Sequence, residues 1–451
     1  MMSKKIASSF WVTALFYTIL QRISLFVFGV TAYMILVRGF STETNGVWAL
    51  YVTFYSLLEA IKQGLIRNAT IRFLGMKEYA QDKDAVQTSS LVINISFTIL
   101  MVLLILSSAH WFSELLKAPL LQPLLLYSTI IVALLVPYNH CEILLQAKFK
   151  FDTLFVAGFI RQGFFFAGIL TTYFFFRNYF SLLNVLMIQV VALIASLIFI
   201  LVKTSGLLIQ KLKVDIPLTW KIFHFGKYTF GTNLFAGLSR SFDHFVTANA
   251  LGPIDGKDYV AYYNTVARIN NMVDVPSLAA ADVLYPKNVE AHENEGAEKV
   301  KYYFEQVTGT ILAFIVPLSV FIFIFPRFII YVIAGPQYYP AIIILQLTIL
   351  FSIVRPLSYQ FGSTLDAIGK PQINFRVNAL LMVLNLILTY FLLKTYGGIG
   401  AAYATMIYYT VSFISMWLIL KKYINLDVKE ILQIAIKRYT DMYHYLKGKD
   451  I

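Results

Sequence analysis

The chain has 451 residues, of which 58% are hydrophobic and 14% are charged, and its mean hydropathy is +0.69. Soluble globular proteins carry about 25% charged residues, so this composition excludes that class. The net charge of +13 does not indicate a nucleic-acid partner, because the basic residues lie between hydrophobic runs rather than on a polar domain. The single cysteine, Cys141, excludes a disulfide framework and a thiolate metal site.

The apolar residues come in continuous runs, and each run is long enough to cross about 30 Å of hydrocarbon as a helix. The first run begins near Trp11 and is too long for a removable signal peptide. We therefore expect an all-α integral membrane protein with about twelve transmembrane helices. The expected spans are 12–37, 46–63, 88–109, 123–146, 153–176, 180–202, 226–248, 260–284, 305–325, 338–362, 371–393 and 397–420.

The basic residues indicate how these spans are oriented. With the N-terminus in the cytoplasm, 24 of the 37 lysines and arginines fall in cytoplasmic segments or, in the case of Arg376, close to one, six fall in outside segments and seven others lie within spans. An excess of lysine and arginine is typical of the cytoplasmic side of a membrane protein. Both termini are therefore expected in the cytoplasm.

A long cytoplasmic gap, 203–225, divides the twelve spans six and six, as expected where two repeats join. We predict an N-terminal lobe over 1–202, an inter-lobe linker over 203–225, a C-terminal lobe over 226–420 and a basic cytoplasmic tail over 421–451.

Within this tail, the segment from Asp427 to Leu446 has apolar residues at helical spacing and basic residues on other faces. The apolar residues are Val428, Ile431, Leu432, Ile436, Tyr439, Tyr443 and Leu446, and the basic ones are Lys429, Lys437 and Arg438. The pattern favours a helix that lies on the anionic inner leaflet, and a solvated tail is the alternative.

The charged residues inside the predicted spans include seven basic and five acidic ones. They are Arg22, Lys62, Arg161, Lys227, Arg240, Arg268 and Arg355, with the acids Glu59, Glu142, Asp243, Asp274 and Asp282. An ionised side chain at mid-bilayer costs at least about 2.5 kcal/mol, so these groups should face the protein interior or a water-filled cavity. Four of them lie near span ends and are expected to extend to the interface, namely Lys62, Glu142, Lys227 and Asp282.

Deep arginines outnumber deep acids, which favours an anionic substrate, because a guanidinium binds phosphate through two hydrogen bonds and stays charged at any depth. Arg22, for example, lies about 15 Å along its span, near the midplane. The candidates for substrate binding are Arg22, Arg240, Arg268, Arg355 and Arg161. A purely structural network of interior charges is the alternative.

Three acids, Glu59, Asp243 and Asp274, are candidates for binding a coupling Na⁺ or H⁺ or for making ion pairs. Glu59 is three residues from Lys62, and Asp243 is three residues from Arg240. In each pair the two side chains lie on one face of a helix, so their charges can neutralise each other. We expect no catalytic residue, no metal site and no cofactor.

Five segments at span ends resemble a known family when they are taken in order. They are residues 39–50 (GFSTETNGVWAL), 142–152 (EILLQAKFKFD), 260–264 (VAYYN), 365–370 (LDAIGK) and 397–402 (GGIGAA). In these segments the chain resembles the polysaccharide-biosynthesis flippases. These belong to the multidrug/oligosaccharidyl-lipid/polysaccharide exporter superfamily. It departs from them where Asn45-Gly46 replaces the usual Phe-Gly and where a glycine is missing near Ala261. Many relatives also have fourteen helices.

The resemblance implies a MATE-like transporter, with two six-helix lobes around a central cavity that opens alternately to each side. It implies a bacterial inner-membrane protein that flips an undecaprenyl-pyrophosphate-linked oligosaccharide for cell-surface polysaccharide biosynthesis. The partners implied are that lipid-linked oligosaccharide, membrane lipids and other polysaccharide-assembly proteins. Arg22 and Arg240 match the positions where relatives hold the pyrophosphate.

Other functional classes remain as alternatives. A cation-coupled multidrug exporter of the same superfamily would favour acids over arginines in its cavity, and flipping of a peptidoglycan precursor is also open. A membrane-embedded polymerase or transferase is the alternative from another class. Zinc-helix, nucleophile-elbow and phosphate-loop motifs are absent from the sequence, so we expect a protein that is not an enzyme.

Overall fold

The computed structural model describes residues 2–40, 42–115, 118–250 and 255–446. Within these ranges it leaves undescribed the side chains of 2–12, 236–250, 255–258 and 442–446 and of several residues in 37–61 and 260–264. The described residues form α-helices and short 3-10 turns, with no strand among them. The predicted all-α fold class is therefore confirmed.

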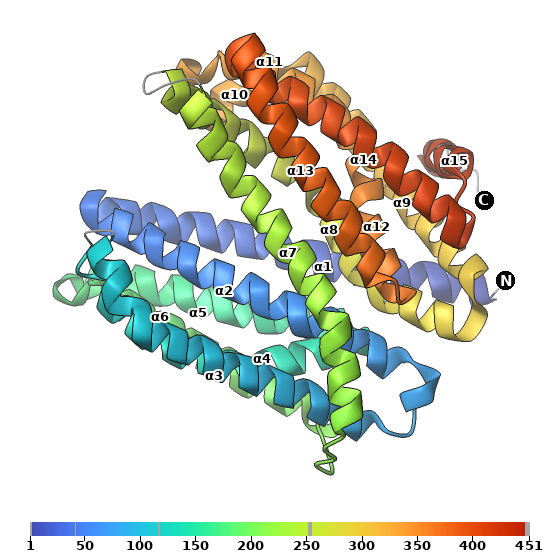
Figure 1. Ribbon diagram of the computed structural model, residues 1–451, viewed down its shortest axis with the longest axis horizontal. Coiled ribbons are helices and arrows are strands. Elements are labelled where there is room, and N and C mark those ends of the chain that lie inside the picture. The colour runs from blue at the N-terminus through green and yellow to red at the C-terminus, as the bar shows by residue number, and fades with distance from the viewer. Residues whose placement is uncertain (1, 41, 116–117, 251–254, 447–451) are drawn as a thin grey trace. The chain divides into compact units, whose positions relative to one another are not determined.

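The chain divides into two compact units, Met1–Phe230 and Gly231–Ile451, and the division falls inside α7. The helices up to this point are α1 (Met2–Gly39), α2 (Thr42–Gly75), α3 (Lys83–Leu115), α4 (Leu121–Ala147), α5 (Phe151–Phe175), α6 (Leu182–Thr204) and α7 (Ile216–Ala250). In unit 1, α5 packs between α1 and α6, and α4 packs against α2, α3 and α6 (Figure 1).

Unit 2 contains the end of α7 and eight further helices. They are α8 (Asp255–Glu295), α9 (Ala297–Ile324), α10 (Pro326–Ala334), α11 (Ala341–Ile349), α12 (Arg355–Ala367), α13 (Pro371–Tyr396), α14 (Gly400–Ile424) and α15 (Val428–Leu446). The long helix α8 packs against α9, α11 and α12, and α13 packs against α14. Each of the twelve predicted spans falls on one of these helices or on the broken helix described below.

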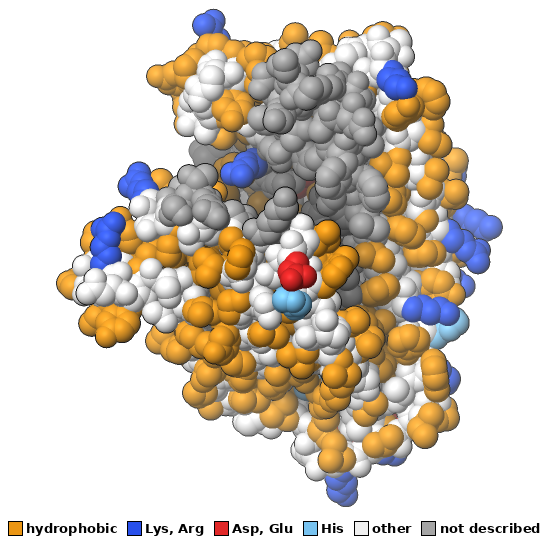
Figure 2. Space-filling view, turned by 60° about the vertical axis from the view of Figure 1, so that its left-hand side comes forward, with side chains coloured by type: hydrophobic (Ala, Val, Ile, Leu, Met, Phe, Trp, Pro, Cys, Tyr) orange, Lys and Arg blue, Asp and Glu red, His pale blue; other side chains and the backbone are white. Residues whose placement is uncertain are grey.

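By length and hydropathy, seven helical segments of the described residues can cross a membrane, or eight when a bent pair counts as one span. Their outward side chains suit lipid, because large apolar residues such as Ile198, Phe314 and Leu380 are exposed. On the face shown in Figure 2, hydrophobic side chains cover much of the described surface and most lysines and arginines lie at its margins. The chain is a multi-pass membrane protein, and the number of twelve spans stays a prediction.

The tenth predicted span, 338–362, is broken rather than continuous. Ala341–Ile353 and Arg355–Ala367 meet at an angle of 47°. Proline lacks the backbone N–H that would continue the helical hydrogen bonds, so Pro356 suits the first turn of α12 and interrupts a helix passing through it. The break at this proline places Arg355 at the junction of the two helices.

The segment before α7 lies within the predicted linker and is held against the start of α3. The carboxylate of Asp84 accepts the backbone N–H groups of Gln210 and Lys211 at 3.3 and 3.2 Å. The Lys213 Nζ donates to Asp82 Oδ1 at 2.5 Å, and this hydrogen bond raises the pKa of Lys213 above its ordinary value. The connection between the sixth and seventh spans is therefore ordered against unit 1.

A close crossing of α2 and α7 depends on a glycine. A Cβ at Gly226 would lie 2.0 Å from the backbone oxygen of Leu65, and the neighbouring Thr229 Oγ1 donates to the Gly64 oxygen at 2.5 Å. Backbone atoms cannot yield as a flexible side chain does, so the two helices would have to move apart.

We expect Gly226→Val to lower the melting temperature of the purified protein, because overpacking costs about 1–3 kcal/mol or more. Gly206→Ala is the matched control, since nothing lies within 4 Å of a Cβ at Gly206. Equal melting temperatures for the two variants would show that the close crossing of α2 and α7 does not exist.

Candidate functional site

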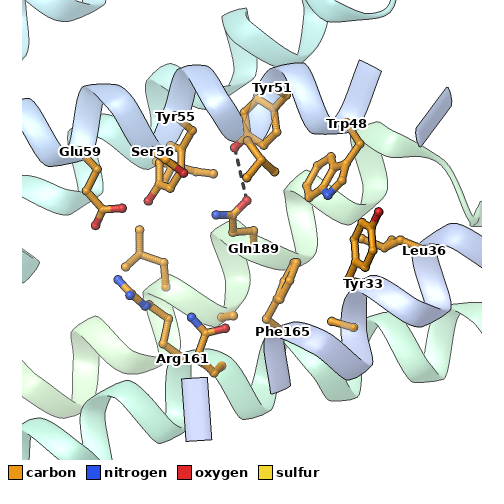
Figure 3. A pocket seen from close by; sticks show the side chains of 17 residues that line it. Tyr33, Leu36, Trp48, Tyr51, Tyr55, Ser56, Glu59, Arg161, Phe165 and Gln189 are labelled. Atoms are coloured by element: carbon orange, nitrogen blue, oxygen red, sulfur yellow. Dashed lines mark hydrogen bonds between the residues drawn. The ribbon is translucent and has the colours of Figure 1, made fainter. Parts of the chain in front are cut away.

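A cavity of about 530 Å³ lies within unit 1. Its walls come from α1, α2, α4, α5 and α6, and Figure 3 shows its lining side chains. They are Gly29, Ala32, Tyr33, Leu36, Trp48, Tyr51, Val52, Tyr55, Ser56, Glu59, Ile131, Arg161, Gln162, Phe165, Gln189, Ala192 and Leu193. The volume is in the range of small-molecule sites, which is about 300–1,000 Å³.

One wall is a stripe along α2 made by Trp48, Tyr51, Tyr55 and Glu59. Their spacings of three, four and four residues place them on one face of a helix. The ring centroids of Trp48 and Tyr51 are 5.0 Å apart, and those of Tyr51 and Tyr55 are 6.1 Å apart. The stripe therefore passes from an aromatic end to a carboxylate along one helix.

The opposite wall comes from α5 and α6. Arg161, Gln162 and Phe165 lie within two turns of α5, and Gln189 projects from α6 (Figure 3). The Tyr51 hydroxyl donates to Gln189 Oε1 at 3.3 Å. This hydrogen bond fixes the Gln189 amide through its oxygen. The two N–H donors lie on the opposite side of the amide group from Tyr51.

The fixed charges of the cavity lie at one end. In Figure 3, Glu59 and Arg161 face each other from the two walls, away from Trp48 and Phe165. The Arg161 guanidinium lies 5.1 Å from the ring centroid of Tyr138, and it interacts electrostatically with Glu59. Glu59 Oε1 also accepts a hydrogen bond from Gln63 at 3.4 Å. One cation and one anion thus lie among the lining residues.

Of the residues predicted from sequence, the structure places Arg161 and Glu59 in this cavity together. The sequence suggested them separately, as one of five basic candidates and as a partner for Lys62. The aromatic stripe was not predicted as part of a site, although its helical spacing in residues 48–59 was visible in the sequence.

A second pair of predicted residues meets in unit 2. Arg355 Nη1 lies 2.8 Å from Asp274 Oδ2, and the two side chains are only 5% and 2% exposed. Asn270 Oδ1 accepts from Arg355 Nη2 at 3.3 Å, and the same nitrogen donates to Ser352 Oγ. The Tyr359 hydroxyl donates to Asp274 Oδ2 at 3.0 Å. This guanidinium is neutralised inside unit 2, at the break between α11 and α12.

The other predicted residues lie elsewhere. Arg22 is half-buried on α1 and is not among the lining residues of the cavity, and Arg268 is exposed on α8. The side chains of Arg240 and Asp243 lie outside the described residues.

The expectation that Lys62 extends to the membrane interface is wrong. Its side chain is 2% exposed, and its Nζ atom is buried without a hydrogen-bond partner among the described residues. The predicted span ended at residue 63, whereas α2 continues to Gly75, so Lys62 lies in the middle of the helix. A lysine buried to this degree does not extend into the interface.

Metal binding finds no support in the described part of the chain, where no group of three or more His, Cys, Asp or Glu side chains could hold an ion. The cavity instead offers aromatic faces, two amides, one carboxylate and one guanidinium. These groups can bind an organic molecule that has both apolar faces and hydrogen-bonding edges.

Comparison with known proteins gives a family and a fold. Residues 35–343, more than half of the chain, match a family model described as polysaccharide biosynthesis protein. A probable low-salt glycan biosynthesis flippase of Haloferax volcanii is 23% identical over 42% of this chain and 40% of its own length. An uncharacterised membrane protein of Methanocaldococcus jannaschii is 29% identical over 37% of this chain. The chain covers only 33% and 40% of the lengths of the Methanocaldococcus and Haloferax proteins.

Solved structures of similar fold are transporters. An outward-facing multidrug-resistance MATE family transporter of the MOP superfamily superposes with a TM-score of 0.79 over 92% of this chain and 95% of its own, at 15% identity. A MOP superfamily transporter of Pyrococcus furiosus, described as having a binding pocket of reverse polarity, superposes with a TM-score of 0.75 over 91% and 95%, at 14% identity. At these identities the likeness shows the fold alone, which is that of the MOP transporters.

Proposed function

Because the chain belongs to the polysaccharide biosynthesis protein family, a family of flippases, and has the MOP transporter fold, we propose that it flips a lipid-linked oligosaccharide across the membrane by alternating access. The substrate proposed is an undecaprenyl-pyrophosphate-linked oligosaccharide, and the direction is from the cytoplasmic to the outer leaflet. The membrane proposed is a bacterial inner membrane, with both termini in the cytoplasm.

The observation that carries this proposal is the cavity of unit 1. A site for an oligosaccharide needs hydrogen-bonding groups as well as apolar surface, and the cavity presents both from five helices. The Haloferax volcanii relative, described as a probable glycan biosynthesis flippase, supports the same substrate class.

A multidrug exporter is less well supported, although several solved structures of this fold are MATE transporters. A cation-binding cavity needs an acid whose charge is available to the drug. Glu59 is the only acid among the described lining residues, and it faces Arg161, so a cationic drug would meet a guanidinium at the same end.

The energy source and the partners are also part of the proposal. Transport would draw on a coupling Na⁺ or H⁺, for which Glu59 and Asp274 are the described candidates. Asp274 is bound by Arg355, and Na⁺ at Glu59 would meet the facing guanidinium of Arg161, so a proton carried by Glu59 is the better candidate. Other polysaccharide-assembly proteins would supply the substrate and consume it. No catalytic step is assigned to the chain.

Deletion of the gene tests the proposed function. We expect lipid-linked oligosaccharide to accumulate on the cytoplasmic face of the membrane and surface polysaccharide to be lost, with both restored by the wild-type gene. Ethidium accumulation measured in the same cells is the control for drug export. Normal lipid-linked oligosaccharide together with raised ethidium would overturn the proposal in favour of a drug exporter.

A further inference from the structure

We infer that the unit 1 cavity is a subsite for an uncharged part of the glycan, and that the pyrophosphate of the substrate is held elsewhere. This inference rests on the proposed function and adds which portion of the substrate the cavity takes. Three features of the cavity support it: its charge, its aromatic end and its fixed amide.

The charge of the lining residues opposes ionic ligands of either sign. Arg161 and Glu59 lie at the same end of the cavity (Figure 3), so the described lining carries one charge of each sign. A pyrophosphate bound to Arg161 would lie at the same end of the cavity as the Glu59 carboxylate, and repulsion between like charges disfavours its binding. A neutral polyol suits both groups, because one hydroxyl can donate to the carboxylate while another accepts from the guanidinium.

The aromatic end of the cavity matches the apolar ring face of a sugar. A pyranose has apolar C–H groups on its ring faces and hydroxyls around its rim. Trp48, Tyr33 and Phe165 form the end of the cavity away from the charges (Figure 3), so an aromatic surface and a polar end lie in one chamber. Aromatic side chains provide a large, rigid contact area of this kind.

The amide of Gln189 lies between the two ends. Its carbonyl oxygen is held by Tyr51, which leaves the N–H donors as the groups available to a ligand. A donor that is fixed in advance binds more tightly and more selectively than a mobile one. Ionic substrates gain little from such a group, whereas a hydroxyl or an acetamido oxygen can accept from it.

The test compares two substrates in proteoliposomes made with the full chain. One is the native lipid-linked oligosaccharide, and the other is the same lipid trimmed enzymatically to a single sugar. We expect Trp48→Ala and Gln189→Leu to slow flipping of the native substrate at least about tenfold, as loss of one or two well-placed contacts would. Flipping of the trimmed substrate should stay within about twofold of wild type. Trp220→Ala, an exposed tryptophan outside the cavity, is the control.

The outcomes separate the two proposals. If wild-type protein flips neither substrate, the proposed function fails. If wild type flips both and the variants slow both equally, or slow neither, the glycan subsite is wrong. Gln189→Leu nearly preserves side-chain volume, so it keeps the test valid if Trp48→Ala, at a largely buried position, reduces the amount of folded protein.

A second observation, in unit 2, concerns α15. The geometry points to a helix that lies in the cytoplasmic leaflet of an anionic bilayer. One face packs on α9 through the buried Ile431 and Ala435, and Tyr439 donates from its hydroxyl to the Ala313 oxygen at 2.7 Å. In Figure 1, α15 is seen nearly end-on beside α14, so it crosses the long helices of this unit.

The rest of α15 divides into an apolar and a polar sector. Leu432, Ile436 and Tyr439 follow helical spacing on one side, and Leu432 and Ile436 are 50% and 63% exposed. At 100° per residue the polar residues Gln433, Lys437 and Thr440 come next around the helix. A helix at the junction of protein, membrane and water needs one side against protein, the next side against lipid and the side after that against water. The three sectors of α15 follow this order.

The neighbouring surface has the matching character. Next to the Tyr439 contact at Ala313, α9 exposes Phe314 and Leu318 as part of the lipid-facing surface, so the apolar stripe of α15 continues it. The exposed Lys429 and Lys437 lie on the polar side of α15, where they can meet anionic headgroups, while Arg438 donates to Thr310 Oγ1 and Gln306 Oε1 of α9 at 3.1 and 3.2 Å.

A fluorophore attached to single cysteines tests this placement in nanodiscs. In a Cys141→Ala background, Ile436→Cys and Gln433→Cys place NBD on the apolar and polar sectors of the same helix. We expect lipids brominated near the headgroup end of the acyl chain to quench NBD at 436 at least about twice as strongly as at 433, with stronger quenching in anionic lipid. Equal quenching at the two positions, or none, would overturn the placement, and equal quenching in neutral and anionic lipid would overturn the preference.

Discussion

Arg161→Ala is expected to slow flipping of the lipid-linked oligosaccharide at least about tenfold, because a hydrogen bond to a charged group contributes about 1.5–3 kcal/mol. Arg161 is the only basic side chain among the described residues that line the unit 1 cavity. Its removal also leaves Glu59 without the facing cation and changes the charge of the chamber. The measurement is the initial flipping rate in proteoliposomes at matched protein content.

Arg177→Ala is the matched control for this variant. Arg177 follows the same helix, and its guanidinium lies 5.1 Å from the Tyr173 ring centroid, as Arg161 does from Tyr138. Arg177 is exposed and outside the cavity, so its removal should leave the flipping rate near that of wild type. Wild-type transport by Arg161→Ala at normal abundance would show that the cavity guanidinium does not act on the substrate.

Asp274→Ala is expected to destabilise unit 2 by about 3–5 kcal/mol, because it leaves the buried guanidinium of Arg355 without its carboxylate. The double variant Asp274→Ala with Arg355→Met removes both charges and should recover much of this loss. The measurement is the temperature at which half of the purified protein is lost from the monodisperse fraction on size-exclusion chromatography.

Glu290→Ala is the matched control for the ion pair. Glu290 pairs with Lys287 on the same helix α8 at 2.6 Å, but both side chains are partly exposed. Exposed pairs contribute about 0–1 kcal/mol, so this variant should melt close to wild type. If Asp274→Ala melts no lower than Glu290→Ala, the buried pair does not stabilise the unit.

The sequence predicted the helices well because each carries its own signal. Apolar runs of sufficient length locate the spans, and Pro356 marks the break in the tenth because its missing N–H acts locally. The tail helix was predicted from its spacing and is present as α15. Where local hydropathy fades, as after residue 63 of α2, the helix continues beyond the predicted span, and the burial of Lys62 was missed.

The site was less accessible from sequence because it is built by residues far apart in the chain. Arg355 and Asp274 are separated by 81 residues, and nothing local to either indicates the other. Glu59 and Arg161 come from different helices, so their meeting depends on how α2, α4, α5 and α6 pack. The sequence identified the charges that need a protein environment, and packing decides which are paired inside one unit and which line a cavity.

The most direct measurement of the central claim is transport by wild-type protein in proteoliposomes loaded with native lipid-linked oligosaccharide. An impermeant glycosidase added outside would report the fraction of glycan that reaches the outer leaflet. We predict that this fraction rises with time only in vesicles that contain the protein, and that ethidium is not moved in the same preparation. Unchanged protection of the glycan, with ethidium transported instead, would contradict a glycan-lipid flippase.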